Sequence, residues 1–232
     1  MPQDPASTPD TPPPGTAATG PARRWLVLGG SALAIALGLG VLYGTSGGWS
    51  NASAPGCAAA RPVVEAMRPL ARGDVAAVQV PKEPRPVPAL AFTGPDGQPT
   101  SLAAFRGKTV LFNLWATWCA PCRHEMPALD RLQATLGGDA FQVVAVNIDT
   151  RNPDKPRQWL ADNGIARLAY FSDPAAKTFQ ELKSAGKAFG MPTTLIVDRD
   201  GCELGVIAGP ADWAGEDALR LLRAAIGRDR PS

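Results

Sequence analysis

The stretch that decides the fold is Val110-Leu111-Phe112-Asn113-Leu114-Trp115-Ala116-Thr117-Trp118-Cys119-Ala120-Pro121-Cys122. Its first half belongs to a continuous apolar run, 109–115, which is typical of a central strand buried on both faces. Its second half ends in two cysteines three residues apart, and residues 122–136 after it predict a helix. A buried strand followed by such a helix predicts an α/β fold in which the cysteines lie where the helix starts.

The segments on either side of this stretch continue the alternation of strands and helices. Gly94-Pro95-Asp96-Gly97, between short strands at 89–92 and 98–102, predicts a β-hairpin. Pro127 has no backbone N–H and predicts a kink in helix 122–136. We further expect strands at 141–148, 168–171, 193–197 and 204–208, and helices at 57–72, 156–163, 174–184 and 212–226. The last two strands are joined by a short turn, so they must be antiparallel in a mixed sheet.

The first 56 residues are not expected to belong to the folded domain, 57–228. Residues 1–22 are rich in Pro, Thr and Ala and predict a disordered cytoplasmic tail. Residues 23–44 begin with two arginines and continue with twenty uncharged residues, which predicts a transmembrane signal anchor with a cytoplasmic N-terminus. A cleaved signal peptide is the alternative, but the candidate cleavage motif Ala52-Ser53-Ala54 lies far from the apolar core. Residues 45–56 then form a linker.

Charge and cysteine content narrow the class of protein. A net charge of +2 points neither to a nucleic acid nor to an acidic partner. Four cysteines permit three pairings, and the economical one joins Cys57 to Cys202 and leaves Cys119 and Cys122 for chemistry. Stable disulfides fit a location outside the cytoplasm. Structural zinc is disfavoured because four ligands are needed and only Cys57, Cys202 and His124 remain beside the pair.

The cysteine pair predicts thiol–disulfide exchange. Backbone N–H groups and the dipole at a helix N-terminus stabilise a thiolate, and Cys119, just before the helix, gains most from them. We therefore expect Cys119 to be the nucleophile and Cys122, one turn inside the helix, to be the resolving thiol. Trp118 is expected to shield the pair and shape the surface beside it, and Pro121 to stiffen the turn.

A second segment, Gly190-Met191-Pro192-Thr193-Thr194, is expected to complete the site. Pro192 opens a strand, and we favour a cis Met191–Pro192 bond beside the cysteines over an ordinary strand-start proline. The backbone of Met191 would then pair with an extended client segment. Glu125, three residues after Cys122, is either a proton acceptor and donor or an ordinary acidic group of a first helical turn. No metal or cofactor is expected.

These residues resemble a known family. Residues 110–127, with Val146-Asn147-Ile148-Asp149-Thr150, Gly190-Met191-Pro192-Thr193 and Gly201-Cys202-Glu203, are similar to the membrane-anchored thioredoxin-like proteins of the TlpA type, which are thiol:disulfide interchange proteins. The resemblance covers residues 57–228. It implies a thioredoxin fold with an N-terminal β-hairpin and a central helix–strand insertion, preceded by one transmembrane helix. It also implies a structural Cys57–Cys202 disulfide and a cis bond at Pro192.

The resemblance implies a place and partners as well. The catalytic domain would lie in the periplasm, tethered to the inner membrane by a single span. It would act as a reductant on client disulfides, among them apocytochromes c, copper-delivery proteins and the copper subunit of cytochrome oxidase. Electrons would come from a membrane thiol-electron transporter.

The sequence departs from related proteins at two places, and two alternative functions stay open. Cytosolic thioredoxins bury an aspartate where this chain has Asn113, so any proton relay must use Glu125 or water. Ala120-Pro121 lacks the histidine found in strongly oxidising periplasmic pairs, which favours a reductant. A copper carrier of related fold is one alternative, but such carriers use Cys-x-x-x-Cys with a distant histidine. A thiol oxidase is the other, and a glutathione buffer would separate it from a reductase.

Overall fold

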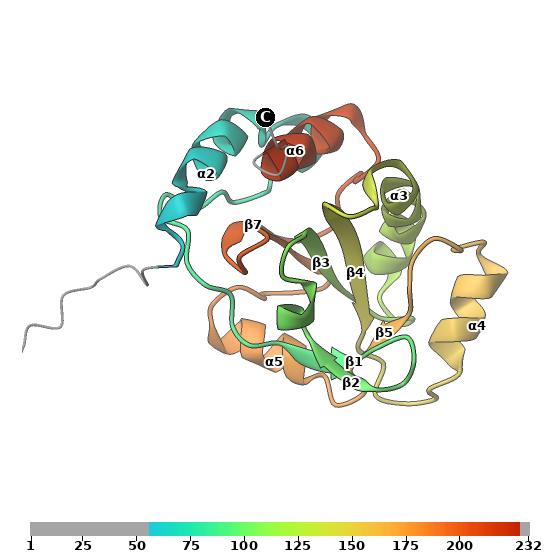
Figure 1. Ribbon diagram of the computed structural model, residues 1–232. Coiled ribbons are helices and arrows are strands. Elements are labelled where there is room, and N and C mark those ends of the chain that lie inside the picture. The colour runs from blue at the N-terminus through green and yellow to red at the C-terminus, as the bar shows by residue number, and fades with distance from the viewer. Residues whose placement is uncertain (1–55, 228–232) are drawn as a thin grey trace, which may run out of the picture. The chain divides into compact units, whose positions relative to one another are not determined.

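The computed structural model describes residues 56–227, and in this part of the chain seven strands form one mixed sheet in the order β2-β1-β5-β4-β3-β6-β7 (Figure 1). The strands are β1 Ala91–Thr93, β2 Pro99–Ser101, β3 Thr109–Trp115, β4 Phe141–Asn147, β5 Phe171–Ser172, β6 Thr193–Val197 and β7 Glu203–Ala208. The helices are α2 Arg61–Met67, α3 Ala120–Leu136, α4 Lys155–Asp162, α5 Lys177–Ser184 and α6 Glu216–Ile226, with 3₁₀ turns at Ala58–Ala60, Arg68–Leu70, Gly73–Val75 and Leu102–Phe105.

β3 is the central strand, and all of its residues are buried. It pairs in parallel with β4 and antiparallel with β6, so that Asn113 lies beside Ala145 on one side and Thr194 on the other. The predicted bounds 109–115 and 193–197 are confirmed, as are the hairpin of β1 with β2 and the antiparallel pairing of β6 with β7. A continuous apolar run with no charged residue fits a strand that is covered on both faces.

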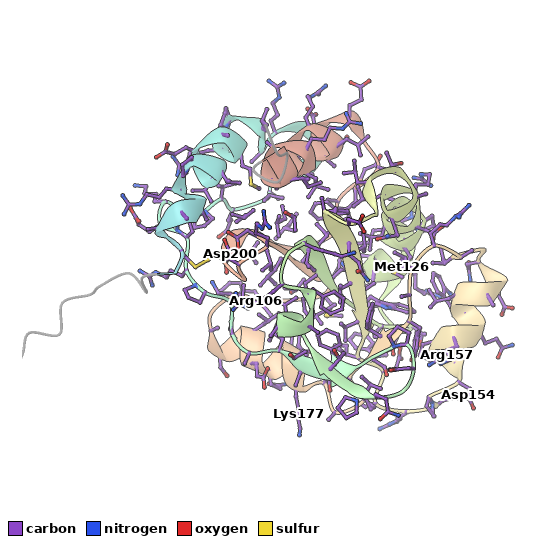
Figure 2. All side chains as sticks on the ribbon, viewed as in Figure 1. Arg106, Met126, Asp154, Arg157, Lys177 and Asp200 are labelled. Atoms are coloured by element: carbon purple, nitrogen blue, oxygen red, sulfur yellow. A yellow bond between two sulfur atoms is a disulfide. The ribbon has the colours of Figure 1, made fainter. Side chains whose placement is uncertain are left out.

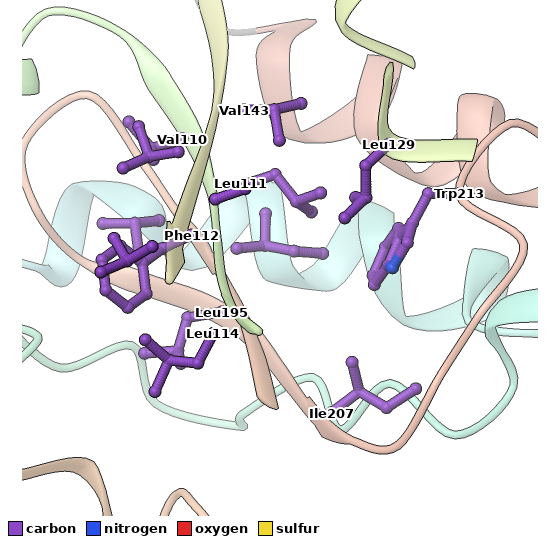
Figure 3. Packing of buried hydrophobic residues seen from close by; sticks show 14 of the residues in the cluster. Val110, Leu111, Phe112, Leu114, Leu129, Val143, Leu195, Ile207 and Trp213 are labelled. Atoms are coloured by element: carbon purple, nitrogen blue, oxygen red, sulfur yellow. The ribbon is translucent and has the colours of Figure 1, made fainter. Parts of the chain in front are cut away.

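The two faces of β3 carry different parts of the core (Figure 3). Leu111 lies on the same side as Leu129 of α3 and Trp213, while Phe112 and Leu114 lie on the other side with Leu195. The hairpin contributes to this second side, because the ring of Phe92 lies 5.8 Å from that of Phe112. Alternation of side chains along a strand therefore directs Leu111 and Asn113 toward α3.

Residues 79–87, which precede β1, cover the edge of the sheet beyond β7. Gln79 forms an antiparallel bridge with Val206, and the Val87 N–H donates to the carbonyl of Gly201 at 3.1 Å. Arg106 donates to the backbone carbonyl of Asp200 in the same β6–β7 turn (Figure 2). These contacts satisfy backbone groups that an exposed edge strand would leave unpaired.

The insertion between β4 and α5 consists of α4 and β5, as the family resemblance implies. It packs on the end of β3 through Trp159, whose ring lies 5.6 Å from that of Trp115. Arg157 of α4, labelled in Figure 2, lies 4.0 Å above the ring centre of Tyr170 and makes a cation–π contact within the insertion. The insertion is thereby attached beside the end of β3 that leads to the cysteines.

Some predicted elements have other bounds. The strand expected at 168–171 is instead β5 at Phe171–Ser172, because Asp130 of α3 accepts the N–H groups of Arg167 and Leu168 and removes them from sheet pairing. The helix expected at 174–184 begins at Lys177, and the one expected at 212–226 begins at Glu216. The helix expected at 57–72 is divided into a short α-helix flanked by two 3₁₀ turns. The second turn contains a proline, which has no backbone N–H to donate to the helix.

The predicted tail at 1–22, anchor at 23–44 and linker at 45–56 lie outside the described residues, except for Gly56. Among residues 56–227, no helix has both the length and the apolar composition that a membrane span needs.

Candidate active site

The two central cysteines lie where β3 gives way to α3. Cys119 is the N-cap of α3 and forms a disulfide with Cys122, with 5.3 Å between their Cα atoms. The Cys122 N–H points at the sulfur of Cys119, 3.3 Å away, which is an N-terminal capping interaction with a sulfur acceptor. Cys119 retains 5% of its surface and Cys122 none, so an attacking molecule meets Cys119 first. Pro121 occupies the first helical turn, where its missing N–H is harmless.

The loop that leads to Cys119 is held by a carboxylate from the next strand. Asp149, just after β4, accepts both the N–H and the hydroxyl of Thr117 at 2.8 Å, and it also accepts the side-chain amide of Asn147 at 2.7 Å. All three residues are buried. Sequence reasoning missed Asp149 as a site residue. The available signal was an acidic residue following the predicted strand 141–148, at the sheet edge where the cysteine strand also ends.

The Met191–Pro192 peptide bond is cis, as expected, and it precedes β6. β6 runs antiparallel to β3 with Thr193 opposite Leu114, so the cis bond and the cysteines share one end of the sheet. The carbonyl of Pro192 accepts the N–H of Gly209 at 2.8 Å. Within the described residues, no hydrogen bond is made by the backbone of Met191, which is half-buried.

Glu125 lies beneath the site, 2% exposed, on the first turns of α3. Its carboxylate accepts the Asn113 side-chain amide at 2.8 Å and the Ala211 N–H at 3.2 Å. The same Asn113 amide nitrogen donates to the Thr194 hydroxyl at 2.9 Å. Burial raises the pKa of Glu125 from 4.5 to about 7, and the hydrogen bonds from Asn113 and Ala211 oppose this only in part. The carboxyl therefore exchanges a proton near neutral pH.

A cleft of about 620 Å³ opens next to this carboxyl. Glu125 and Ala211 belong to its lining, together with the polar side chains of His124, Arg131 and Asp212. The cleft therefore gives the buried carboxyl a route to solvent on the α3 side. His124, the chain's single histidine, is exposed on α3.

Two large apolar side chains remain exposed in the described part of the chain, Trp118 at 63% and Phe189 at 80%. Trp118, expected to shield the pair and shape the surface beside it, is exposed and directly precedes the nearly buried Cys119. Phe189 was not singled out by sequence reasoning. A single aromatic residue in a loop carries no signal by itself, and only its place two residues before Met191 gives it meaning.

The other cysteine pair lies away from this site. Cys57 and Cys202 form a disulfide with 5.7 Å between their Cα atoms, and both are buried. Cys202 lies in the turn between β6 and β7, beyond Val197, and Val197 pairs with Val110 at the opposite end of β3 from the catalytic loop. The remaining predicted site residues, Cys119, Cys122, Pro121, Trp118, Glu125, Met191 and Pro192, gather at or beneath one end of β3 and β6.

Comparison with known proteins gives the same picture. The Redoxin family model matches residues 82–222. The thioredoxin-like protein YneN of Bacillus subtilis (strain 168) is 35% identical over 111 residues, 45% of this chain and 59% of YneN. The thiol:disulfide interchange protein HelX of Rhodobacter capsulatus is 39% identical over 105 residues, 45% of this chain and 54% of HelX. The chain thus spans little more than half the length of these two relatives.

A solved structure extends the likeness to the fold. The structure of a candidate thiol:disulfide interchange protein DsbE from Chlorobium tepidum is 32% identical, with a TM-score of 0.53 over 61% of this chain and 96% of that one. The fold is therefore thioredoxin-like α/β. Because the family model spans more than half of the sequence, the chain belongs to the Redoxin family.

Proposed function

We propose that this protein is a thiol:disulfide oxidoreductase that acts as a protein-disulfide reductase of the TlpA type. The observation that carries the proposal is the Cys119–Cys122 disulfide at the start of α3, on the same sheet end as the cis Met191–Pro192 bond. In this disulfide, one sulfur lies at a helix N-terminus and the other lies one turn inside the helix. Such a disulfide can be reduced and re-formed reversibly, because the helix N-terminus stabilises the thiolate of the first cysteine. The relatives' names, thiol:disulfide interchange proteins, support the same chemistry.

The reaction starts from the reduced pair. The Cys119 thiolate attacks one sulfur of a client disulfide, forming a mixed disulfide and releasing the other client sulfur as a thiolate. The Cys122 thiolate then attacks the Cys119 sulfur, closing the enzyme disulfide and releasing the second client thiolate. Two electrons pass to the client, and two protons from the enzyme thiols end on the client thiols. A dithiol protein must then return two electrons to the enzyme.

Glu125 is the group that handles the Cys122 proton in this scheme. Its pKa of about 7 lets it accept a proton as Cys122 becomes a thiolate and release it afterwards. The 620 Å³ cleft beside the carboxyl supplies the exchange with solvent. Asn113 keeps one carboxylate oxygen in place through its side-chain amide but carries no exchangeable acid of its own.

The client docks as an extended segment at Met191. The free backbone of Met191 provides the hydrogen bonds of an added strand, and Trp118 and Pro121 form the surface next to the attacking sulfur. We propose clients from cytochrome c or cytochrome oxidase copper-site assembly, as the TlpA resemblance implies. The catalytic domain would then lie in the periplasm on a membrane anchor within residues 23–44, with a membrane thiol transporter as donor.

The deciding experiment combines a redox titration with trapping. The full-length chain is equilibrated in buffers that contain reduced and oxidised glutathione in graded ratios. If the protein is a reductant, its Cys119–Cys122 couple should have a reduction potential below that of the thiol–disulfide couples in its compartment. A Cys122→Ser variant should accumulate client proteins as mixed disulfides through Cys119, to be identified by mass spectrometry, and Cys119→Ser should trap none. A potential in the range of strong oxidants would instead support a thiol oxidase. Absence of mixed disulfides with Cys122→Ser would refute the exchange itself.

A further inference from the structure

One buried hydrogen-bond donor of the core, the indole N–H of Trp213, has no partner. Among the residues that the structure describes, the buried side-chain atoms without a hydrogen bond are Asn113 Oδ1, Glu203 Oε2 and Trp213 Nε1. Glu203 Oε2 forms an ion pair with Lys187, and the Asn113 amide donates to Glu125 through its nitrogen. Trp213 is therefore the one donor of the three. A fully buried donor without an acceptor is costly and rare, so its place in the fold needs a reason.

The loop before α6 brings Trp213 to Glu125. The Ala211 N–H donates to the Glu125 carboxylate at 3.2 Å, and the backbone N–H of Trp213 donates to the carbonyl of Ala211 at 3.1 Å. The indole ring lies on the same side of β3 as Leu129 (Figure 3), which follows Glu125 by four residues on α3 and shares its helix face. The indole group is close enough to lower the pKa of Glu125, although it completes no hydrogen bond here.

The other groups around Glu125 leave its charge to the buried donors. β3 and β6 face it with the uncharged side chains of Asn113 and Thr194, and the buried Cys122 precedes it by one turn of α3. The charged or titratable side chains that line the cleft beside it are all exposed to water: Asp74, His124, Arg131 and Asp212. Water and salt screen exposed charges strongly, whereas a donor inside the core acts on the carboxylate at full strength.

We propose that Trp213 is a positioning residue for Glu125 and that its indole N–H donates to the carboxylate while the carboxylate is charged. A small shift of the ring or of the carboxylate makes this bond, which is stronger to a charged acceptor than to a neutral one. When the enzyme disulfide closes, the Cys122 S–H bond breaks, an O–H bond forms on Glu125, and the sulfur keeps the electron pair that attacks Cys119. Trp213 thus keeps Glu125 charged and ready for that proton. The inference rests on the proposed function, which gives Glu125 this task.

Replacing the indole by a ring without an N–H should make Glu125 harder to ionise. Trp213→Phe keeps an aromatic ring in the core and removes the donor, so the pKa of Glu125 should rise from about 7 by about one pH unit. At pH 7 the charged share of Glu125 then falls from about one half to about one tenth, and disulfide closure should slow about fivefold. At about pH 9, where Glu125 is charged in both proteins, closure should be similarly fast.

Two measurements on the full-length chain report this shift. The first is urea unfolding of the oxidised protein between about pH 5 and pH 9. The folded pKa of Glu125 exceeds its unfolded value, so its contribution to stability is lost as pH rises through the folded pKa, and Trp213→Phe should raise the midpoint of that loss by about one pH unit. The smaller ring also weakens packing, but it does so equally at every pH and leaves the midpoint unchanged.

The second measurement follows closure of the enzyme disulfide. The reduced protein is mixed with excess oxidised glutathione, samples are quenched with acid, and mass spectrometry counts the Cys119–glutathione mixed disulfide as it forms and disappears. The rate of disappearance, measured at each pH, reports the step in which Cys122 attacks. Two controls accompany Trp213→Phe. Trp159→Phe, in the insertion, should leave both pH midpoints unchanged, and in a Glu125→Gln background Trp213→Phe should add no further pH dependence.

The outcomes separate this inference from the proposed function. Unchanged midpoints in Trp213→Phe, a slowing that is equal at every pH, or the same shift in Trp159→Phe would overturn the role of Trp213 and leave the exchange reaction intact. A shift that persists with Glu125→Gln would overturn it as well. If the stability midpoint moves as expected but the wild type neither forms nor closes the mixed disulfide, the proposed function fails, whereas the contact between Trp213 and Glu125 stands.

Discussion

The side-chain amide of Asn113 on β3 lies 2.8 Å from a carboxylate oxygen of Glu125 on α3 and joins the central strand to the cysteine helix beneath the disulfide. Both residues are buried, so the pair places a titratable group inside the core, three residues from Cys122. Burial favours the protonated carboxyl, which is the reason that this group titrates near neutral pH rather than near pH 4.5. The titration of Glu125 should therefore affect both the folding stability and the exchange reaction.

Glu125 should make stability depend on pH. The folded pKa of about 7 exceeds the ordinary value of 4.5, so the folded state binds the proton more tightly than the unfolded state. The contribution of this group is complete below about pH 4.5 and is lost as pH rises through about 7, a loss of about 3 kcal/mol. Urea unfolding at about pH 5 and pH 8 should show this loss in the wild type and not in Glu125→Gln. Parallel pH curves for the two proteins would contradict the assignment.

Removing the second disulfide should cost stability rather than chemistry. Cys57 and Cys202 are 145 residues apart, and closing a loop of that length is worth about 5 kcal/mol in the chain-entropy model. The double variant Cys57→Ser with Cys202→Ser should therefore unfold at much lower urea. While folded, it should reduce peptide disulfides at a rate close to the wild type, because the bridge lies at the other end of β3. A variant of normal stability with lost activity would reverse this reasoning.

The two catalytic thiols should differ in reactivity after reduction. Cys119 receives the N–H of Cys122 and retains some surface, whereas Cys122 is fully buried. Iodoacetamide near neutral pH should therefore modify Cys119 first, with mass spectrometry of the digested protein reporting the site. Cys119→Ser should react slowly at Cys122. If iodoacetamide modifies Cys122 before Cys119, or modifies neither thiol, Cys119 is excluded as the nucleophile.

Asp149 should position the Cys119 loop. Asp149→Ala leaves the buried N–H and hydroxyl of Thr117 without an acceptor, at a cost of about 1–3 kcal/mol in unfolding free energy, and should also slow disulfide exchange. Asp149→Asn keeps one oxygen and should recover most of the exchange rate.

Asp173 offers the matched control for this prediction. Its carboxylate binds the N–H and hydroxyl of Thr178 at 2.7 and 2.8 Å, the same pair of bonds at the start of a different helix. Asp173→Ala should lose comparable stability with little change in exchange rate per folded molecule. Equal slowing by both variants would mean that Asp149 acts on the fold alone.

Local sequence determined much of the framework. The uncharged run 109–115 specified a doubly covered strand, and the cysteine spacing before a helix specified the exchange chemistry, since both depend on neighbours along the chain. The hairpin and the antiparallel last strands followed from short turns that leave no other connection. The predicted helix 122–136 is present as α3, which continues through Pro127 to Leu136.

The tertiary structure decided the electrostatics and the surfaces. Glu125 could equally have been an exposed first-turn acid. Its pKa is raised by burial in the core, and the hydrogen bond from Asn113, 12 residues away on another element, opposes this only in part. Asp149 carries no local pattern, because its role arises from its hydrogen bonds with Thr117, a residue of another segment. Spacing along a chain encodes periodic local structure, whereas desolvation and exposure depend on which distant segments the fold brings together.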